Sequence, residues 1–154
     1  MPAVITPERP DTPDAIALIT ELEEHLSAGY PAESRHGYSV EKLIKQGVAF
    51  FVTRVDGKPA GCGGIQLFGT EFGELKRMYV RPEFRCQGLA RMMVDHLVAY
   101  AARHGMKVVR LETGVNQHAA ITLYERAGFR PIPPFPPYFP DPLSQCYEKS
   151  IADQ

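Results

Sequence analysis

The sequence predicts a single α/β domain in which helices flank a mixed, mostly antiparallel central sheet. Three observations support this fold class. The chain has 154 residues, which is the size of one domain, so we expect one unit over residues 1–154. Two strand-like runs flank Asp56-Gly57, a β-hairpin signal. A long helical pattern at residues 86–104 lies between strand-like segments, as in a crossover connection. The predicted order is β-α-α-β-β-β-α-β-α-β-β.

The N-terminal half is predicted to contain two helices and an antiparallel group of strands. A short strand at about residues 3–6 precedes a helix at about 12–27, and a second, short helix covers about 39–46. The longer helix has apolar residues at helical spacing: Ala15, Leu18, Ile19, Leu22 and Leu26. The next three strands are VAFFVTRV, KPAGCGGIQLFG and EFGELKRMYV.

The C-terminal half is predicted to contain strand–helix–strand crossovers. The helix at 86–104 ends at Gly105, and the helix HAAITLYERAG is stopped by Gly128. The first of these has one apolar face, made of Leu89, Met92, Met93, Leu97 and Ala101. The remaining strands are MKVVRLET, FRPI and LSQCYEKSI.

Proline is concentrated in the connection between the last two strands. Seven of the 14 prolines lie in the segment PIPPFPPYFPDP, which cannot form a helix or a central strand. A strand follows this segment, so it is predicted to be a stiff internal loop with Phe135, Tyr138 and Phe139 between its prolines. An internal loop is poorly placed to serve as an SH3-type ligand.

Composition excludes several classes of protein. The net charge of −1 is not that of a dedicated nucleic-acid binder, and no apolar run has the roughly 20 residues that span a bilayer. The N-terminus does not resemble a signal peptide. Cys62, Cys86 and Cys146 show no CxxC spacing, so we expect no disulfide framework and no metal site. A reducing cytoplasm is the expected location.

The segment from Arg85 to Ala90 is predicted to bind a pyrophosphate. It joins a strand to the longest helix, where free N–H groups and the helix dipole favour an anion. Small residues at Gly88 and Ala90 would allow a close approach, and residues 76–91 contain five basic side chains against one acid. The other interpretation is close helix–strand packing with solvated arginines. Neither GxxxxGK[ST] nor GxGxxG is present at this turn, which argues against a P-loop or a Rossmann turn.

These motifs resemble the GNAT superfamily of acyl-CoA-dependent N-acetyltransferases. The family signature Q/R-x-x-G-x-G/A matches Arg85, Gly88 and Ala90, and LETGVNQHAAITLYERAGF is similar to its second signature. The strand GELKRMYV is similar to the fourth strand of the family fold, and the ending YFPDPLSQCYEKSI is similar to small bacterial members with poorly defined acceptors. The resemblance implies the GNAT fold and acetyl-CoA as co-substrate.

The resemblance also implies a cofactor site, position by position. The N–H groups from Arg85 to Ala90 would bind the pyrophosphate, and the backbone of Met78 to Val80 would pair with the pantetheine arm. One N–H there, that of Met78, would polarise the thioester carbonyl. The usual family Asn is replaced by Gln117 with Asn116 beside it, and either amide could make that contact. The expected cofactor residues are Met78, Tyr79, Val80, Arg85, Cys86, Gln87, Gly88, Leu89, Ala90, Arg91, Asn116 and Gln117.

Two residues are candidates for acid–base catalysis. The resemblance places Tyr124 near the departing sulfur, where a phenol can supply a proton. Glu74, 14 residues before Gly88, lies where some family members have a catalytic base. Strict strand alternation would put Glu74, Lys76, Met78 and Val80 on one face. The alternatives are a packing role for Tyr124 and a solvated Glu74, with water chains taking the amine proton. Cys86 as a nucleophile is a further alternative, but no partner His is apparent.

The acceptor pocket is expected between GYPAESRHGY and the proline-rich loop. Glu33, His36, Tyr138 and Asp141 are candidate acceptor contacts, while His25 is interpreted as a helix-surface residue. A stiff, partly aromatic wall favours a small acceptor over a long peptide. The expected activity is acetyl transfer from acetyl-CoA to a primary amine of a small molecule, by a monomer or a homodimer. The alternatives are an acyl-CoA-binding sensor, a protein N-acetyltransferase, or a structural domain without a cofactor.

Overall fold

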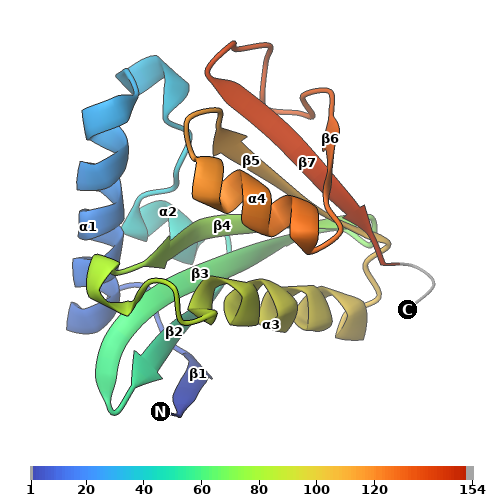
Figure 1. Cartoon of the computed structure of the whole chain (residues 1–154). Helices are drawn as coiled ribbons and strands as arrows, with labels where there is room; N and C mark the ends of the chain where they lie inside the picture. The colour runs from blue at the N-terminus through green and yellow to red at the C-terminus, as the bar shows by residue number, and fades with distance from the viewer. Residues whose placement is uncertain (1, 152–154) are drawn as a thin grey trace.

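The computed structural model describes residues 2–151 and contains the predicted elements in the predicted order (Figure 1). The helices are α1 (Pro13–Gly29), α2 (Val40–Lys45), α3 (Leu89–Arg103) and α4 (His118–Arg126), with short 3-10 helices η1 (Ala32–Ser34) and η2 (Pro82–Phe84). The strands are β1 (Ala3–Pro7), β2 (Ala49–Val55), β3 (Lys58–Phe68), β4 (Phe72–Val80), β5 (Val108–Gly114), β6 (Arg130–Ile132) and β7 (Ser144–Ser150).

The seven strands form one sheet in the order β1-β2-β3-β4-β5-β7-β6. Every neighbouring pair is antiparallel except β4 and β5, which are parallel because the α3 crossover connects them. The predicted mixed, mostly antiparallel sheet is therefore confirmed. The helices α3 and α4 cover the face nearest the viewer in Figure 1, and α1 and α2 cover the other face.

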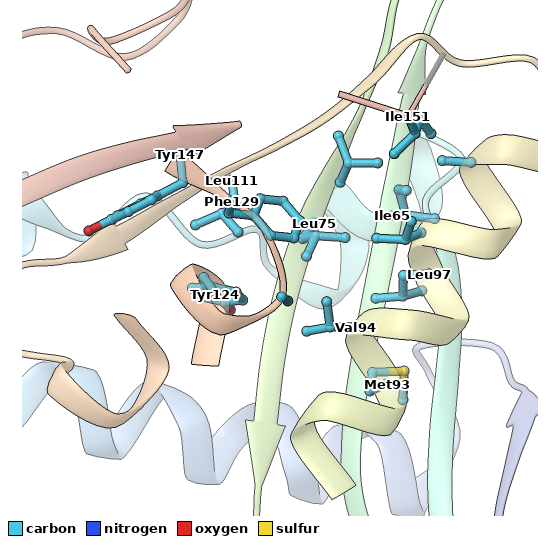
Figure 2. Packing of buried hydrophobic residues seen from close by; sticks show 14 of the residues in the cluster. Ile65, Leu75, Met93, Val94, Leu97, Leu111, Tyr124, Phe129, Tyr147 and Ile151 are labelled. Atoms are coloured by element: carbon cyan, nitrogen blue, oxygen red, sulfur yellow. The ribbon is translucent and has the colours of Figure 1, made fainter. Parts of the chain in front are cut away.

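Each face of the sheet buries its own apolar cluster. The larger cluster joins α3 and α4 to the sheet, and Figure 2 shows Val94 and Leu97 of α3 beside Leu75 of β4. The smaller cluster joins α1 and α2 to β2 and β3 through residues such as Leu18 and Leu43, both fully buried. The predicted apolar stripes therefore supply much of the two cores, but Leu26 and Met92 are half-buried and belong to neither cluster, whereas Val94 and Val98, which were not predicted, are buried in the larger one.

The parallel pair β4 and β5 separates after three residue pairs. Phe72, Gly73 and Glu74 pair with residues 108–110, and β4 has no pairing with β5 beyond Glu74 in the described part of the chain. Figure 1 shows the two arrowheads diverging on the side where α1 lies. The divergence leaves the end of β4 and the end of β5 facing an open wedge in the middle of the sheet.

A β-bulge in β4 overturns the predicted strand alternation. Arg77 has a positive φ of 56°, and neither Arg77 nor Met78 has a Cα partner on β3. The extra residue puts Arg77 on the α1 side, where it pairs with Glu23, while Met78 joins the α3 cluster. Glu74 and Lys76 therefore share a face with Arg77 and Tyr79, whereas Met78 and Val80 point to the opposite face.

The helix predicted at residues 86–104 starts three residues later than expected and is not the longest, because α3 has 15 residues and α1 has 17. α3 begins at Leu89, and Gly88 is its N-cap with a left-handed φ of 78°. Cys86 also has a positive φ, of 63°. The residues from Arg85 to Gly88 therefore form a turn that precedes the helix, because their backbone leaves helical geometry.

Candidate active site

The turn before α3 presents a series of free backbone donors. No carbonyl or side chain among residues 2–151 accepts a hydrogen bond from the N–H groups of residues 86–91. The N–H of Arg85 differs, because it donates to the carbonyl of Pro82 at 3.2 Å. A Cβ on Gly88 would meet no atom within 4 Å, so the space above the turn is open. Free N–H groups at a helix N-terminus, with open space above them, suit a phosphate.

The predicted basic patch is largely neutralised in the folded chain. Four of its five basic side chains form ion pairs, namely Lys76 with Glu74, Arg77 with Glu23, Arg81 with Glu21 and Arg91 with Asp95. The fifth, Arg85, donates from Nε to the carbonyl of Val80 at 3.2 Å. The attraction for an anion at this turn therefore comes mainly from backbone dipoles, not from an arginine cluster.

A cavity of about 150 Å³ lies where β4 and β5 separate. Its walls come from the ends of both strands, from α1 and α4, and from the segment 34–37. Met78 lies in the wall, and among the described residues it has no register partner on β3 or β5. That its N–H meets a ligand stays a prediction. The cavity therefore joins the cofactor side of the predicted site to the acceptor side.

Glu74 is a buried carboxylate in this cavity with one oxygen free. Its side chain is 1% exposed, and Oε2 accepts a hydrogen bond from the Tyr138 hydroxyl and lies 2.9 Å from Lys76 Nζ. Oε1 is buried without a partner among residues 2–151. The Lys76 ammonium compensates the buried charge, while Oε1 keeps its lone pairs available. The interpretation of Glu74 as a solvated strand-end residue is wrong.

Tyr124 reaches the same cavity from α4. Its side chain is buried at the edge of the larger apolar cluster, beside Phe129 (Figure 2). Burial raises the pKa of its phenol, so the hydroxyl stays protonated at neutral pH. The hydroxyl has no hydrogen-bond partner in the described residues, and it therefore has a proton to donate to a ligand.

The four candidate acceptor residues separate into two groups. His36 and Tyr138 line the cavity, and their rings pack edge to face at 5.5 Å. Glu33 is exposed and does not line it. Asp141 lies outside it too, because it holds the proline-rich loop by accepting hydrogen bonds from the Ser34 hydroxyl at 2.7 Å and from the Leu143 N–H at 2.9 Å.

The two amide candidates also differ in position. Gln117 is the N-cap of α4, lines the cavity and lies 3.4 Å from His25 Nε2. The backbone N–H of Asn116 donates to the Tyr30 hydroxyl at 2.9 Å, and Asn116 does not line the cavity. The geometry therefore favours Gln117 over Asn116 as the residue facing a ligand.

Four residues that line the cavity were not among the predicted site residues: Tyr30, Arg35, Lys76 and Glu112. Glu112 accepts a hydrogen bond from the Ser144 hydroxyl at 2.5 Å, and burial raises the pKa of its carboxyl group. Strand alternation in MKVVRLET could have placed Glu112 on the face opposite to Leu111, which belongs to the larger apolar cluster. Arg35 lies in GYPAESRHGY, the segment expected to bound the pocket, but no pattern singled out its side chain.

None of the three cysteines lines the cavity within the described chain. In residues 2–151 no group of three His, Cys, Asp or Glu side chains could hold a metal ion. Cys86 is exposed on the turn and lines no part of the cavity, while burial raises the pKa of Cys62 to about 12. No described helix is long and apolar enough to cross a membrane.

Comparison with known proteins agrees with this geometry. The profile of the acetyltransferase (GNAT) family matches residues 18–129. An IAA acetyltransferase of Azospirillum brasilense is 40% identical, over 98% of this chain and 100% of that protein. A structure from Klebsiella pneumoniae, designated an acyl-CoA N-acyltransferase, is 35% identical with a TM-score of 0.81, covering 96% of this chain and 97% of that one. The PaiA N-acetyltransferase of Thermoplasma acidophilum, in complex with coenzyme A, shares the fold at 20% identity and a TM-score of 0.78, covering 98% and 100%.

Proposed function

The chain belongs to the GNAT family of acetyltransferases, and from that premise we propose that it moves an acetyl group from acetyl-CoA to a primary amine of a small molecule. One observation carries the proposal. The turn with the free N–H groups of residues 86–91 follows β4 in the chain, β4 is unpaired with β5 beyond Glu74, and the cavity that contains Glu74 and Tyr124 lies where the two strands separate. A phosphate site, unpaired strand backbone and an acid–base pair therefore lie along β4 and the turn that follows it.

The residues present fit acetyl-CoA as the co-substrate. The turn offers its N–H groups to the pyrophosphate, and β4 beyond Glu74 offers unpaired backbone to an extended pantetheine arm. The solved relatives from Thermoplasma acidophilum and Elizabethkingia anophelis, which share the fold, contain coenzyme A and acetyl-CoA respectively. When bound, acetyl-CoA supplies a thioester whose carbonyl carbon is the electrophile.

The ammonium group of the acceptor has to lose a proton before the nitrogen can attack the thioester. A free alkyl amine has a pKa of about 10.4, so most of it is protonated at pH 7. Oε1 of Glu74 is the unpartnered acceptor in the cavity, and it takes a proton from the ammonium group. Lys76 and Tyr138 hold the other oxygen and thereby fix the direction in which Oε1 points.

Two further groups complete the transfer. The Met78 N–H, which lies at the bulge and has no register partner on β3, would donate to the thioester oxygen as negative charge develops there. The protonated hydroxyl of Tyr124 would donate its proton to the departing sulfur, and the second proton of the attacking nitrogen would replace it on the phenol as the amide forms. The amine attacks directly, because no cysteine lines the cavity within the described chain.

The size of the cavity favours a small acceptor over a protein. Its volume is about 150 Å³, and the ring of His36 closes it by packing on Tyr138 and Phe139 of the proline-rich loop. This closed wall leaves little room for an extended peptide backbone.

The test has two steps. Acetyl-CoA is first added in a thermal-shift assay, and release of free thiol is then followed with a panel of small amines and one N-terminal peptide. The proposal expects a shift and thiol release with small amines. A thermal shift without thiol release would favour a non-catalytic acyl-CoA sensor. Thiol release with the peptide alone would favour a protein N-acetyltransferase. The absence of a thermal shift with acetyl-CoA would favour a structural domain without a cofactor.

A further inference from the structure

We propose that the acceptor carries a carboxylate besides its amine, and that Arg35 binds this carboxylate. The inference rests on the proposed function and names the substrate class: an amino acid or a related amino-carboxylate. It starts from the charges that line the cavity.

Three Lys or Arg side chains line the cavity: Arg35, Lys76 and Arg77. Lys76 is paired with Glu74 at 2.9 Å, and Arg77 is paired with Glu23. The side chain of Arg35 makes no hydrogen bond and no ion pair with any residue from 2 to 151, whereas its backbone N–H donates to the carbonyl of Ala32 at 3.2 Å. Its guanidinium is therefore a charge in the cavity wall that no described protein anion neutralises.

The burial of Arg35 makes this lack of a partner costly. Its Nε is buried and has no acceptor among the described residues, while the residue as a whole is half-buried. An N–H of a charged group that has lost water without gaining an acceptor raises the free energy of the fold. A carboxylate removes that penalty, because the planar guanidinium fork matches its two oxygens.

The backbone on both sides of Arg35 is held in place. Ser34 donates to Asp141 at 2.7 Å, and His36 packs on Tyr138. Gly37 lies against the Arg77 guanidinium so closely that a Cβ there would come within 1.9 Å of it. Of the segment 34–37, Arg35 has the side chain left for a ligand, and its anchored neighbours preorganise it.

Another part of the cavity wall, on β4 and β5, suits the amine end of the same molecule. Glu74 offers its free Oε1, and Glu112 adds a second carboxyl group from β5. The negative charge of Glu74 contributes to the raised pKa of Glu112, after burial, so the two groups act on one another. A molecule with an ammonium group at the β4–β5 wall and a carboxylate at Arg35 complements both charges.

Pairs of acceptors that differ by one carboxylate test the inference. The probes are L-phenylalanine with phenethylamine, L-tyrosine with tyramine, and L-lysine with cadaverine. Each is measured for thiol release with acetyl-CoA, and for thermal shift of the protein in the presence of coenzyme A. The variants are Arg35→Gln, which removes the charge, Arg35→Lys, which keeps the charge without the fork, and Arg126→Gln, which changes an exposed arginine outside the cavity.

The wild-type protein should prefer the carboxylated member of a pair. Arg35→Gln should raise the KM for that member by about 10- to 100-fold, as expected for loss of a hydrogen bond to a charged group. It should also reduce the thermal shift that this member produces. The decarboxylated member and acetyl-CoA should be unaffected, Arg35→Lys should keep part of the preference, and Arg126→Gln should behave as wild type.

Several results would overturn the inference. The first is that the wild-type protein shows no preference within any pair. The second is that Arg35→Gln raises the KM equally for both members of a pair. The third is that Arg35→Gln abolishes the thermal shift with acetyl-CoA, which would assign Arg35 to the cofactor. Thiol release from decarboxylated amines alone would keep the proposed function and reject the carboxylate. A carboxylate-dependent shift that needs Arg35, without any thiol release, would keep the carboxylate site and reject the transferase.

Discussion

Tyr124 and Glu74 line the same cavity, one as a proton donor and the other as a proton acceptor. Burial keeps the Tyr124 phenol protonated and without a partner, while the Glu74 carboxylate is held by Lys76 and Tyr138 with one oxygen free. A proton donor and a proton acceptor from different elements are the pair that acyl transfer to an amine requires. Each can be tested by a change that preserves shape.

Tyr124→Phe should lower turnover by about 10- to 1,000-fold, within or near the usual range for general acids. Its affinity for acetyl-CoA should change little, because only the hydroxyl is removed. The raised pKa also predicts that the wild-type kcat has no loss from phenol ionisation below about pH 10. Steady-state kinetics and a pH profile measure both.

The matched control is Tyr147→Phe, which removes a hydroxyl from another buried tyrosine of the same apolar cluster. It should leave turnover unchanged. Equal activity of Tyr124→Phe and wild type would reduce Tyr124 to a packing residue.

Glu74→Gln should lower turnover strongly at pH 7 and recover in part at higher pH, where the amine deprotonates by itself. The same change strands the Lys76 ammonium in a buried site, at 6% exposure, and should cost about 3–5 kcal/mol of stability. Chemical denaturation and pH–rate profiles measure the two effects.

The double variant Glu74→Gln, Lys76→Met separates those effects. It removes the stranded charge and should restore most of the stability, while activity stays low if Glu74 is the base. Recovery of full activity in the double variant would mean that water takes the amine proton.

At the scale of elements, the turn before α3 is the feature that the sequence predicted best. Small residues at Gly88 and Ala90 and the long apolar stripe after them indicated a helix N-terminus beside a strand. The bulge in β4 was not predictable, because Arg77 carries no sign of its positive φ. Glycine or asparagine would have indicated it. One inserted residue reversed the facing of Met78 and Val80, since side chains alternate with a period of two.

Gly88→Glu should abolish the binding of acetyl-CoA while the protein stays folded. The new carboxylate would stand in open space above the N–H groups that the pyrophosphate needs, and like charges repel. Calorimetric titration with acetyl-CoA measures the loss.

The control is Gly105→Glu, at the other end of the same helix. Gly105 has a φ of 77° and equally open surroundings, so the backbone strain is matched. Gly105→Glu should bind acetyl-CoA normally, and unchanged binding by Gly88→Glu would move the pyrophosphate elsewhere.

At the scale of the whole molecule, the sheet is two groups of strands joined by three residue pairs. The group β1 to β4 and the group β5 to β7 meet only at the start of β4 and β5. The order of elements and the sheet class were predictable from periodicity and turn residues. The wedge, the ion pairs and Arg35 were not, because they depend on contacts between residues far apart in the chain, such as Glu23 with Arg77.

Acetyl-CoA should therefore stabilise the molecule as a bridge between the two groups of strands. At a concentration of 100 times its Kd, it should add about 2.7 kcal/mol to the free energy of unfolding. Hydrogen exchange of the amides near Met78 and Gly114 should slow more than exchange in β2. Uniform slowing across the sheet would contradict binding in the wedge.

The donors of residues 86–91 belong to the backbone, and every amino acid except proline carries one. On the proposed function, mutations in this turn can accumulate with little effect on cofactor use, apart from the left-handed positions at Cys86 and Gly88. The acceptor side depends on side chains such as Arg35 and Glu112, which a single nucleotide change can replace. Descendants of such a gene can exchange one acceptor for another while they inherit the same acetyl donor.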